Sequence, residues 1–277
     1  MFGMTFPATF ASAQESTTPN FSHIRTWGVL YRHINVDDAE AQWWATHLDF
    51  TVFGPIYWGN KFRTFSTAPA VTYMNHNNIT VESSSSSDWQ NLVSYAGANF
   101  EDMFLHYAED TTIKLPGGVC TIKGWGNGTA TSRQEARVPT YWIPRTACGG
   151  SQADRWSLNI ANPMLRAWVA QRASMLAVSP YNGIFFDNAS GNWLSSRLGI
   201  VSGGKIIEYP FTDKDSLDNA WNADHKQVLS EAKAALGHRF SIINTSSYQS
   251  NFAWVGSLLS VADGSLREFW FDINNAW

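Results

Sequence analysis

The chain has 277 residues, a formal net charge of −4 and two cysteines, and this length suits one large domain or two small ones. No stretch approaches the length of a membrane span. The slight negative charge, with basic residues scattered along the chain, argues against a nucleic-acid partner, which normally requires a basic face. Aromatic residues are in excess, with 14 Trp, 17 Phe and 9 Tyr, and most of them must be buried because aromatic side chains cover large areas.

Residues 1–22 are expected to form a leader outside the folded domain. Phe10–Ala13, which carries small residues before Gln14, is similar to the end of a secretory signal peptide. The positively charged start of such a signal is missing, so we interpret the segment as a clipped signal peptide, with an ordinary disordered tail as the alternative. A secretory signal predicts a secreted or cell-surface protein, in which Cys120 and Cys148 could pair.

Short apolar runs bounded by turn residues alternate with helical patterns along residues 23–277. A run of this kind suits a strand buried on both faces of a parallel sheet. The expected strands are Thr26–Tyr31, Phe50–Phe53, Val71–Met74, Ile184–Phe186, Phe240–Asn244 and Ser265–Trp270. The expected helices begin at Asp37-Asp38, at Asn162-Pro163 and near Asp215, and a last helical stretch runs to about Val261. Strands that alternate with helices indicate βα units.

Six such units are present where a closed barrel has eight. The predicted fold class is therefore α/β, a (β/α)8 TIM barrel that is incomplete at the C-terminus, with unpaired edges on its first and sixth strands. We expect the complete barrel to be a monomer. The alternative is that two strands lie within residues 100–161, a region rich in Gly, Trp and Thr with few helical repeats. We interpret that region as a long insertion between the third and fourth strands, lying over the C-terminal rim.

Two carboxylates stand on separate expected strands. Asp187 ends the fourth strand and Glu268 lies in the sixth. Barrels carry their chemistry at the carboxyl ends of the strands, and strands four and six can set two carboxyl groups ~5–9 Å apart, a range that covers both outcomes of glycoside hydrolysis. The alternative is that these carboxylates only cap a loop or form a salt bridge. The pair therefore predicts glycoside hydrolysis.

Several motifs resemble a known group of proteins, the hypothetical glycosyl hydrolase barrels, which are predicted relatives of the α-galactosidase and α-amylase-like superfamily of TIM-barrel glycosidases. The resemblance runs from about Trp27 to the last residue, and Gly183–Asn188 is its most specific part. It implies that Asp187 is the nucleophile and Glu268 the acid/base of a retaining enzyme. The motifs that carry it are Thr26–Tyr31, Phe104–His106, Asn162-Pro163 with Arg166–Trp168, Gly183–Asn188, and Asp263-Gly264 with Glu268.

Other polar and aromatic residues at expected strand ends or in the insertion are candidates for substrate binding. Asn188 and Asn244 could bond to sugar hydroxyls or merely close βα turns. We read them as site residues rather than glycan acceptors, although both begin Asn-x-Ser/Thr triplets. The full set of candidates is Arg32, Asn75, His106, Trp142, Asn188 and Asn244.

The expected substrate is a polysaccharide or oligosaccharide, and no cofactor is expected. Metal-ligand spacing, a G-x-S-x-G elbow, a phosphate loop and an H-E-x-x-H helix are all missing from the sequence. The rival hypothesis is a non-catalytic carbohydrate-binding barrel, which would keep aromatic residues at its rim for sugar stacking but lack a competent pair of carboxylates.

Overall fold

The computed structural model describes residues 27–30, 37–54, 56–80, 87–115, 118–140, 148, 155–191, 194, 200–202, 205–245 and 252–266. The predicted leader, residues 1–22, lies outside this part of the chain. Among the described residues, no helix is both long and apolar enough to cross a membrane.

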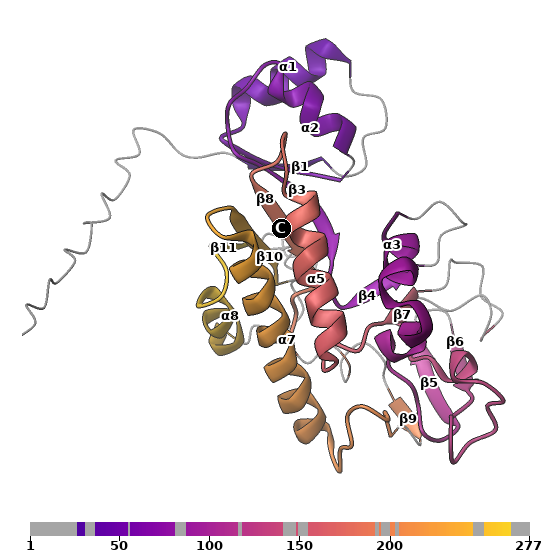
Figure 1. Ribbon diagram of the computed structural model, residues 1–277. Helices are drawn as coiled ribbons and strands as arrows, with labels where there is room; N and C mark the ends of the chain where they lie inside the picture. Colours follow the sequence, from indigo (N-terminus) through magenta and orange to yellow (C-terminus); the bar gives the residue numbers. More distant parts are fainter. Residues whose placement is uncertain are drawn as a thin grey trace, which may run out of the picture.

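A parallel sheet of six strands organises the molecule (Figure 1). The spatial order of the strands is their order in the chain, and each pairs in parallel with the next. This singly wound, curled sheet corresponds to part of a (β/α) barrel. The strands are β1 (Trp27–Leu30), β2 (Phe50–Phe53), β3 (Ala70–Asn75), β8 (Gly183–Asp187), β10 (Phe240–Asn244) and β11 (Gly264–Leu266).

A parallel strand is therefore present at each of the six predicted places. Thr26, Tyr31 and residues 267–270, which the prediction also included, lie outside the described residues. β1 and β11 form the two edges, and the described residues do not pair them into a closed barrel. The alternative that barrel strands lie within residues 100–161 finds no support in the described part of that region. Its strands belong to antiparallel sheets.

Helices begin where the sequence supplies a capping group. Asp37 accepts a hydrogen bond from Glu40 N at 2.8 Å, and Asn162 accepts one from Met164 N at 2.8 Å ahead of Pro163. Both caps confirm the predicted starts. The helices are α1 (Asp38–His47), α2 (Ile56–Arg63), α3 (Ser87–Ala96), α5 (Pro163–Leu176), α7 (Lys214–Leu236) and α8 (Phe252–Leu259).

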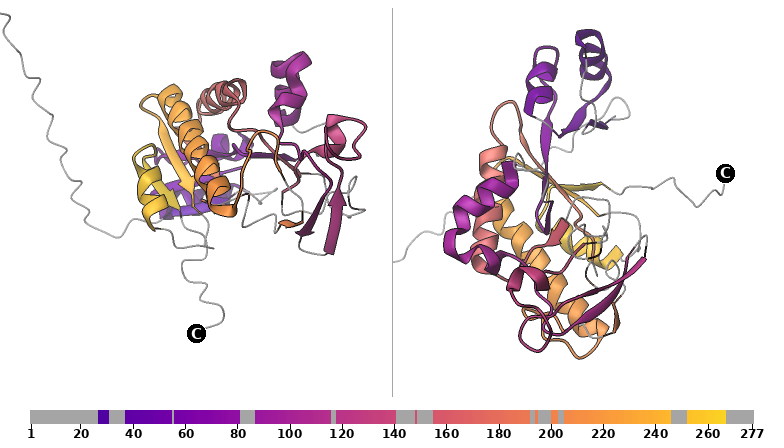
Figure 2. Two further views of the ribbon diagram at one scale, coloured as in Figure 1. Left: turned by 90° about the horizontal axis from the view of Figure 1, so that it is seen from below. Right: turned by 90° about the vertical axis from the view of Figure 1, so that its right-hand side faces the viewer.

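The sheet is covered on both faces. Its outer face, which includes Met74, Phe186 and Ile243, packs in the main core with α5 and α7, and these two helices lie side by side (Figure 2). The inner face carries a smaller apolar cluster around Val71 and Phe185. Because successive strand residues point to opposite faces, this two-sided burial explains why the fourth strand reads as a continuous apolar run.

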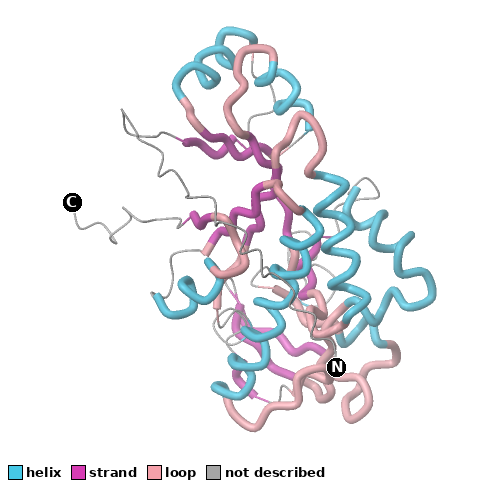
Figure 3. Tube along the Cα trace, turned by 60° about the vertical axis from the view of Figure 1, so that its left-hand side comes forward, coloured by secondary structure: helices cyan, strands magenta, loops and turns pink. Residues whose placement is uncertain are grey.

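The segment between β3 and α5 builds structure of its own; it contains the predicted insertion of residues 100–161 but begins earlier, and it is called the insertion below. Figure 3 shows its strands as a group separate from the parallel sheet. One sheet pairs β5 with β6 and also with β9, a strand that follows β8 in the chain and is not part of the insertion, and another sheet pairs β4 with β7. The insertion also contains the 3-10 helices η1 and η2. Cys120 and Cys148 form a disulfide within the insertion. The bounds are β4 (Asn78–Thr80), η1 (Gly97–Met103), β5 (Thr111–Leu115), β6 (Gly118–Ile122), η2 (Arg133–Ala136), β7 (Arg155–Ser157) and β9 (Ile200–Ser202).

The insertion attaches to the carboxyl end of β3. β4 begins three residues after Asn75, and Leu158 N, just past β7, donates to Asn77 O at 2.9 Å. Asn77 Nδ2 in turn donates to the backbone oxygen of Asn188, immediately after β8, at 2.8 Å. The start of the insertion therefore lies against the ends of two central strands.

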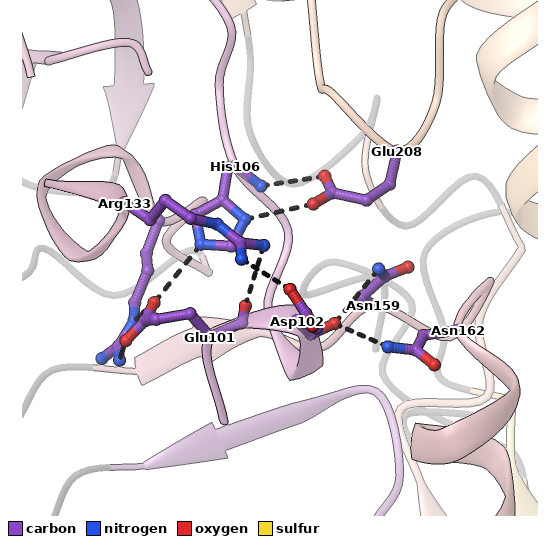
Figure 4. Close-up of polar contacts among 8 residues, drawn as sticks. Glu101, Asp102, His106, Arg133, Asn159, Asn162 and Glu208 are labelled. Carbon is purple, nitrogen blue, oxygen red and sulfur yellow. Dashed lines mark hydrogen bonds and ion pairs between the residues drawn. The ribbon is translucent and has the colours of Figure 1, made fainter. Parts of the chain in front are cut away.

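A buried ionic network holds the insertion to the segment before α7 (Figure 4). His106 is fully buried, and its Nδ1 lies 3.1 Å from Glu208 Oε1 while its Nε2 lies 3.4 Å from Glu101 Oε2. The His106 backbone N–H also donates to Glu208 Oε2 at 3.1 Å. Arg137 pairs with Glu101 from the other side and lies over the Phe104 ring, 4.1 Å from its centroid.

The network sets the charge of its members. Burial alone would lower the pKa of His106, but its hydrogen bonds to Glu101 and Glu208 outweigh burial and raise it. Burial would likewise raise the pKa of Glu101, yet hydrogen bonds from His106 and Arg137 lower it to about 2. A charged histidine between two carboxylates is therefore the stable state of this network.

The network predicts a pH-dependent loss of stability in His106→Gln. A histidine whose pKa is raised by folding stabilises the fold fully below its unfolded value, about 6.5, and that contribution disappears as pH rises through the folded pKa. Urea unfolding between pH 5 and 9 should show the variant less stable by about 1.5–3 kcal/mol near pH 5–6. The difference should shrink above pH 7. His238→Gln, at an exposed histidine, is the control, and a deficit that is constant across this pH range would contradict a charged His106.

A second prediction concerns Gly183, the first residue of β8. A Cβ at this position would lie 2.1 Å from the backbone oxygen of Phe240 in the neighbouring strand. Gly183→Ala should therefore lower the free energy of unfolding by ~1–3 kcal/mol through overpacking. Gly256→Ala is the matched control, because its Cβ meets no atom within 4 Å and it lies within α8. That control should be neutral or stabilising by up to about 1 kcal/mol. Equal effects in the two variants would contradict the close approach of β8 and β10.

Candidate functional site

The inner face of the sheet turns from apolar to polar at the carboxyl ends of three neighbouring strands. Tyr73 and Ile242 pack against the inner apolar cluster, and Asn75 and Asn244 each follow two residues later. Asn75 stands in register with Asp187. Because residues two apart on a strand share a face, these side chains meet at one edge of the sheet, where parallel strands end.

Asp187 is the centre of this polar edge. Tyr73 donates its hydroxyl proton to Asp187 Oδ2 at 2.5 Å, and Asn188 Nδ2 donates to the same oxygen at 2.9 Å. Asn244 Nδ2 donates to the other oxygen, Oδ1, at 2.7 Å. Both oxygens are therefore held by neutral donors, and no ion pair of Asp187 occurs within the described part of the chain. The carboxylate is half-buried and keeps a fixed orientation.

Tyr73 remains a hydrogen-bond donor over a wide range of pH. Burial raises the pKa of its phenol, and the negative charge of Asp187 raises it further, against smaller opposing effects of Arg155 and of the hydrogen bond from Asn75. Tyr73 was not among the site residues predicted from the sequence. The signal that could have found it is its position two residues before Asn75, on the same face of the same strand.

Asn188 is held in a backbone conformation that few residues adopt. Its φ is 62°, in the left-handed region, which asparagine tolerates better than most non-glycine residues. Its side chain donates to Asn75 Oδ1 at 2.7 Å as well as to Asp187. The turn that follows β8 thus places the Asn188 side-chain amide against the carboxylate of Asp187, the last residue of β8.

The amides of Asn188 and Asn244 orient Asp187. Asn244 is only 1% exposed, and its backbone oxygen also accepts from Ala189 N at 2.8 Å. These hydrogen bonds fit the interpretation that both amides close the βα turns. The contacts of these amides with sugar hydroxyls stay a prediction.

A buried histidine pair lies on the helix side of the site. His76 follows Asn75, and its Nε2 lies 2.5 Å from Nε2 of His225 in α7. Both rings are fully buried. Burial lowers the pKa of both, that of His225 to about 3, and repulsion between two protonated rings would lower the pKa of His76 further. The pair is therefore neutral, with one ring as donor, and it joins α7 to the segment that orients Asp187.

The other candidate residues fall into two groups. His106 is fully buried in the network of Figure 4, with its ring nitrogens facing Glu101 and Glu208. As the structure places it, this histidine holds the insertion and has no exposed edge for the predicted contact with substrate. Arg32, Trp142 and Glu268 lie outside the described residues. Among the residues that are described, no group of three or more His, Cys, Asp or Glu side chains could hold a metal ion.

No protein-family model matches the sequence, and no curated protein matches it. Solved structures similar to the chain include the glycoside hydrolase domain of PelA from Pseudomonas aeruginosa, with a TM-score of 0.48 and 10% identity over 88% of this chain and 66% of that chain. A family GH13_31 enzyme has a TM-score of 0.49 and 9% identity over 88% of this chain and 51% of its own.

An α-galactosidase from Thermus thermophilus, solved in complex with stachyose, has a TM-score of 0.45 and 10% identity over 88% of this chain and 44% of its own. These similar structures are glycoside hydrolases. The chain spans between 44% and 66% of the length of the three.

Proposed function

We propose that this protein is a glycoside hydrolase that acts on a polysaccharide or oligosaccharide with Asp187 as its nucleophile. One observation carries the proposal. Asp187 ends a strand of a singly wound parallel sheet, with neutral donors on both of its oxygens. Barrels of this kind use the carboxyl ends of their strands for chemistry. An oriented carboxylate whose charge is not cancelled by an ion pair suits the positive charge that develops at the anomeric centre.

The proposed reaction retains the anomeric configuration. An oxygen of Asp187 attacks the anomeric carbon while a second carboxylic acid gives its proton to the leaving oxygen, and the glycosidic bond breaks. The sugar is then attached covalently to Asp187. The second carboxylate takes a proton from water, and the water oxygen displaces Asp187 and releases the sugar.

The proposal assigns the acid/base role to Glu268. Leu266, the last residue of β11, packs against the inner apolar cluster together with Tyr73 and Ile242. Glu268 follows Leu266 by two positions in the sequence, and residues two apart on a strand share a face. In the strand that the sequence predicts from Ser265 to Trp270, Glu268 would therefore share a face with Leu266.

Location and substrate contacts belong to the same proposal. The Cys120–Cys148 disulfide supports a secreted or surface location, because disulfides persist in oxidising compartments. Arg32, Asn75 and Trp142 are the proposed contacts to sugar. The insertion, which begins at the carboxyl edge of β3, is the proposed wall of the substrate site.

The first test removes each carboxylate without changing its shape. Asp187→Asn and Glu268→Gln should each lower turnover by about 10²–10⁴-fold or more, measured on a panel of α- and β-linked glycans, with circular dichroism unchanged. Asp215→Asn, at an exposed carboxylate, is the control. Azide should restore activity to Asp187→Ala if a covalent intermediate forms. Near wild-type turnover in Asp187→Asn would contradict the assignment of Asp187 as the nucleophile. Glycan binding without turnover in the unmodified protein would favour the non-catalytic carbohydrate-binding barrel.

A second test concerns Tyr73, which donates a hydrogen bond to Asp187. Tyr73→Phe keeps the ring but deletes the hydroxyl that donates to Asp187. Loss of one hydrogen bond to a charged group costs about 1.5–3 kcal/mol, so kcat should fall by roughly 10–150-fold. Tyr95→Phe, at a residue 38% exposed, is the matched control. An unchanged kcat in Tyr73→Phe would show that this hydroxyl does not support the reaction.

A further inference from the structure

A cavity of about 460 Å³ opens at the amino ends of β8 and β10. It lies between the end of α2, the turn from α5 to β8 and the turn from α7 to β10, and its walls include Arg63, Tyr181, His238, Arg239 and Phe240. β8 carries Asp187 at its other end, and a strand of this length spans roughly 13 Å. The cavity is therefore separate from the candidate active site.

Two guanidinium groups line this cavity. They belong to Arg63 and Arg239, His238 lies beside them, and no Asp or Glu is among the described residues that line the cavity. Arg63 donates to Pro180 O at 2.8 Å, to Ala68 O at 2.5 Å and to Asn182 Oδ1. All three of these acceptors are neutral, so the contacts orient the guanidinium without cancelling its charge.

Arg239 supplies the second guanidinium. Its side chain makes no hydrogen bond or ion pair with the part of the chain that the structure describes, while its backbone N–H and C=O bond to Leu236 O and Lys233 Nζ. Lys233 is paired with Asp263, so the Asp263 carboxylate already has a cationic partner other than Arg239. The Arg239 guanidinium can therefore turn toward a ligand in the cavity.

Helix C-termini offset part of this positive charge. α2, α5 and α7 all end beside the cavity, at Arg63, Leu176 and Leu236, and a helix C-terminus is equivalent to about −0.5 charge. The three ends together offset about one and a half of the two guanidinium charges. About half a positive charge remains.

Part of the remaining wall of the cavity is apolar. Phe240 is 37% exposed and Val178 is 44% exposed, and both line it. Guanidinium groups bind phosphate and sulfate oxygens through paired N–H donors, and an exposed aromatic ring can cover the apolar face of a sugar. We propose that this cavity binds a tetrahedral oxyanion, phosphate or sulfate, between Arg63 and Arg239.

Calorimetric titration tests the site on the full chain at low ionic strength, with inorganic phosphate and inorganic sulfate as probes. Saturable binding at one site per chain is expected, and Arg239→Gln should weaken it by about 10-fold or more. Arg239 is the better residue to replace, because Arg63 also ties two turns together. Lys205→Gln, at a side chain 68% exposed, removes the same charge elsewhere and should leave the affinity unchanged.

A second arm distinguishes a free oxyanion from one carried on a sugar. Glucose 6-sulfate and glucose 6-phosphate are titrated beside neutral glucose. Tighter binding of the sugar esters than of the inorganic ions, with the gain lost in Phe240→Ala, would identify an anionic saccharide as the ligand. Equal affinities would identify the free oxyanion.

Two results would overturn the proposal. The first is the lack of saturable binding by every anion probe. The second is an equal loss of affinity in Arg239→Gln and Lys205→Gln, which would mean that the anions respond to net charge alone. None of these measurements uses turnover, so the outcome is independent of whether Asp187 is catalytic.

Discussion

The burial of the central parallel strands on both faces is the constraint on which the rest of the structure depends. β3, β8 and β10 pack outward against α5 and α7 and inward on a second apolar cluster. A strand in this position has almost no place for a polar side chain along its length, because a buried polar group is costly unless it is hydrogen-bonded. Most polar side chains that can take part in binding or catalysis therefore lie at the two ends of these strands.

The two ends have opposite electrostatic character. At the carboxyl end lies the Asp187 carboxylate, whose two oxygens accept hydrogen bonds from neutral donors. At the amino end, Arg63 and Arg239 face a cavity where helix C-termini cancel only part of their charge. The same parallel arrangement explains both, since it gathers all strand ends of one kind, and the matching helix ends, at one edge of the sheet.

The insertion buries ionisable side chains. Their burial is tolerated because each of them has a partner. His106 lies between two carboxylates, and Arg137 is paired with Glu101 and covered by aromatic rings. Burying one member without the others would leave an uncompensated charge. The network therefore makes the position of the insertion depend on the simultaneous presence of Glu101, His106 and Glu208.

Much of the fold was predictable from local sequence. The apolar run before Asp187, the capping residues Asp37 and Asn162 and the alternation of strands with helices depend on neighbours within a few positions, and the structure confirms them. Asp187 itself could be singled out for the same reason, because a carboxylate directly after a doubly buried strand is conspicuous. The short helix α2 was missed. It has only eight residues and depends on Gly59 for its close approach to the Tyr181 ring.

Partners that are distant in sequence were decided by the tertiary structure alone. Tyr73 is 114 residues from Asp187, and Arg63 and Arg239 belong to different units of the fold, so no local pattern could bring either set together. The burial of His106 depends in the same way on Glu208, 102 residues away. Sequence periodicity determines which face of an element is apolar. Only the packing of those faces determines which polar side chains meet at their edges.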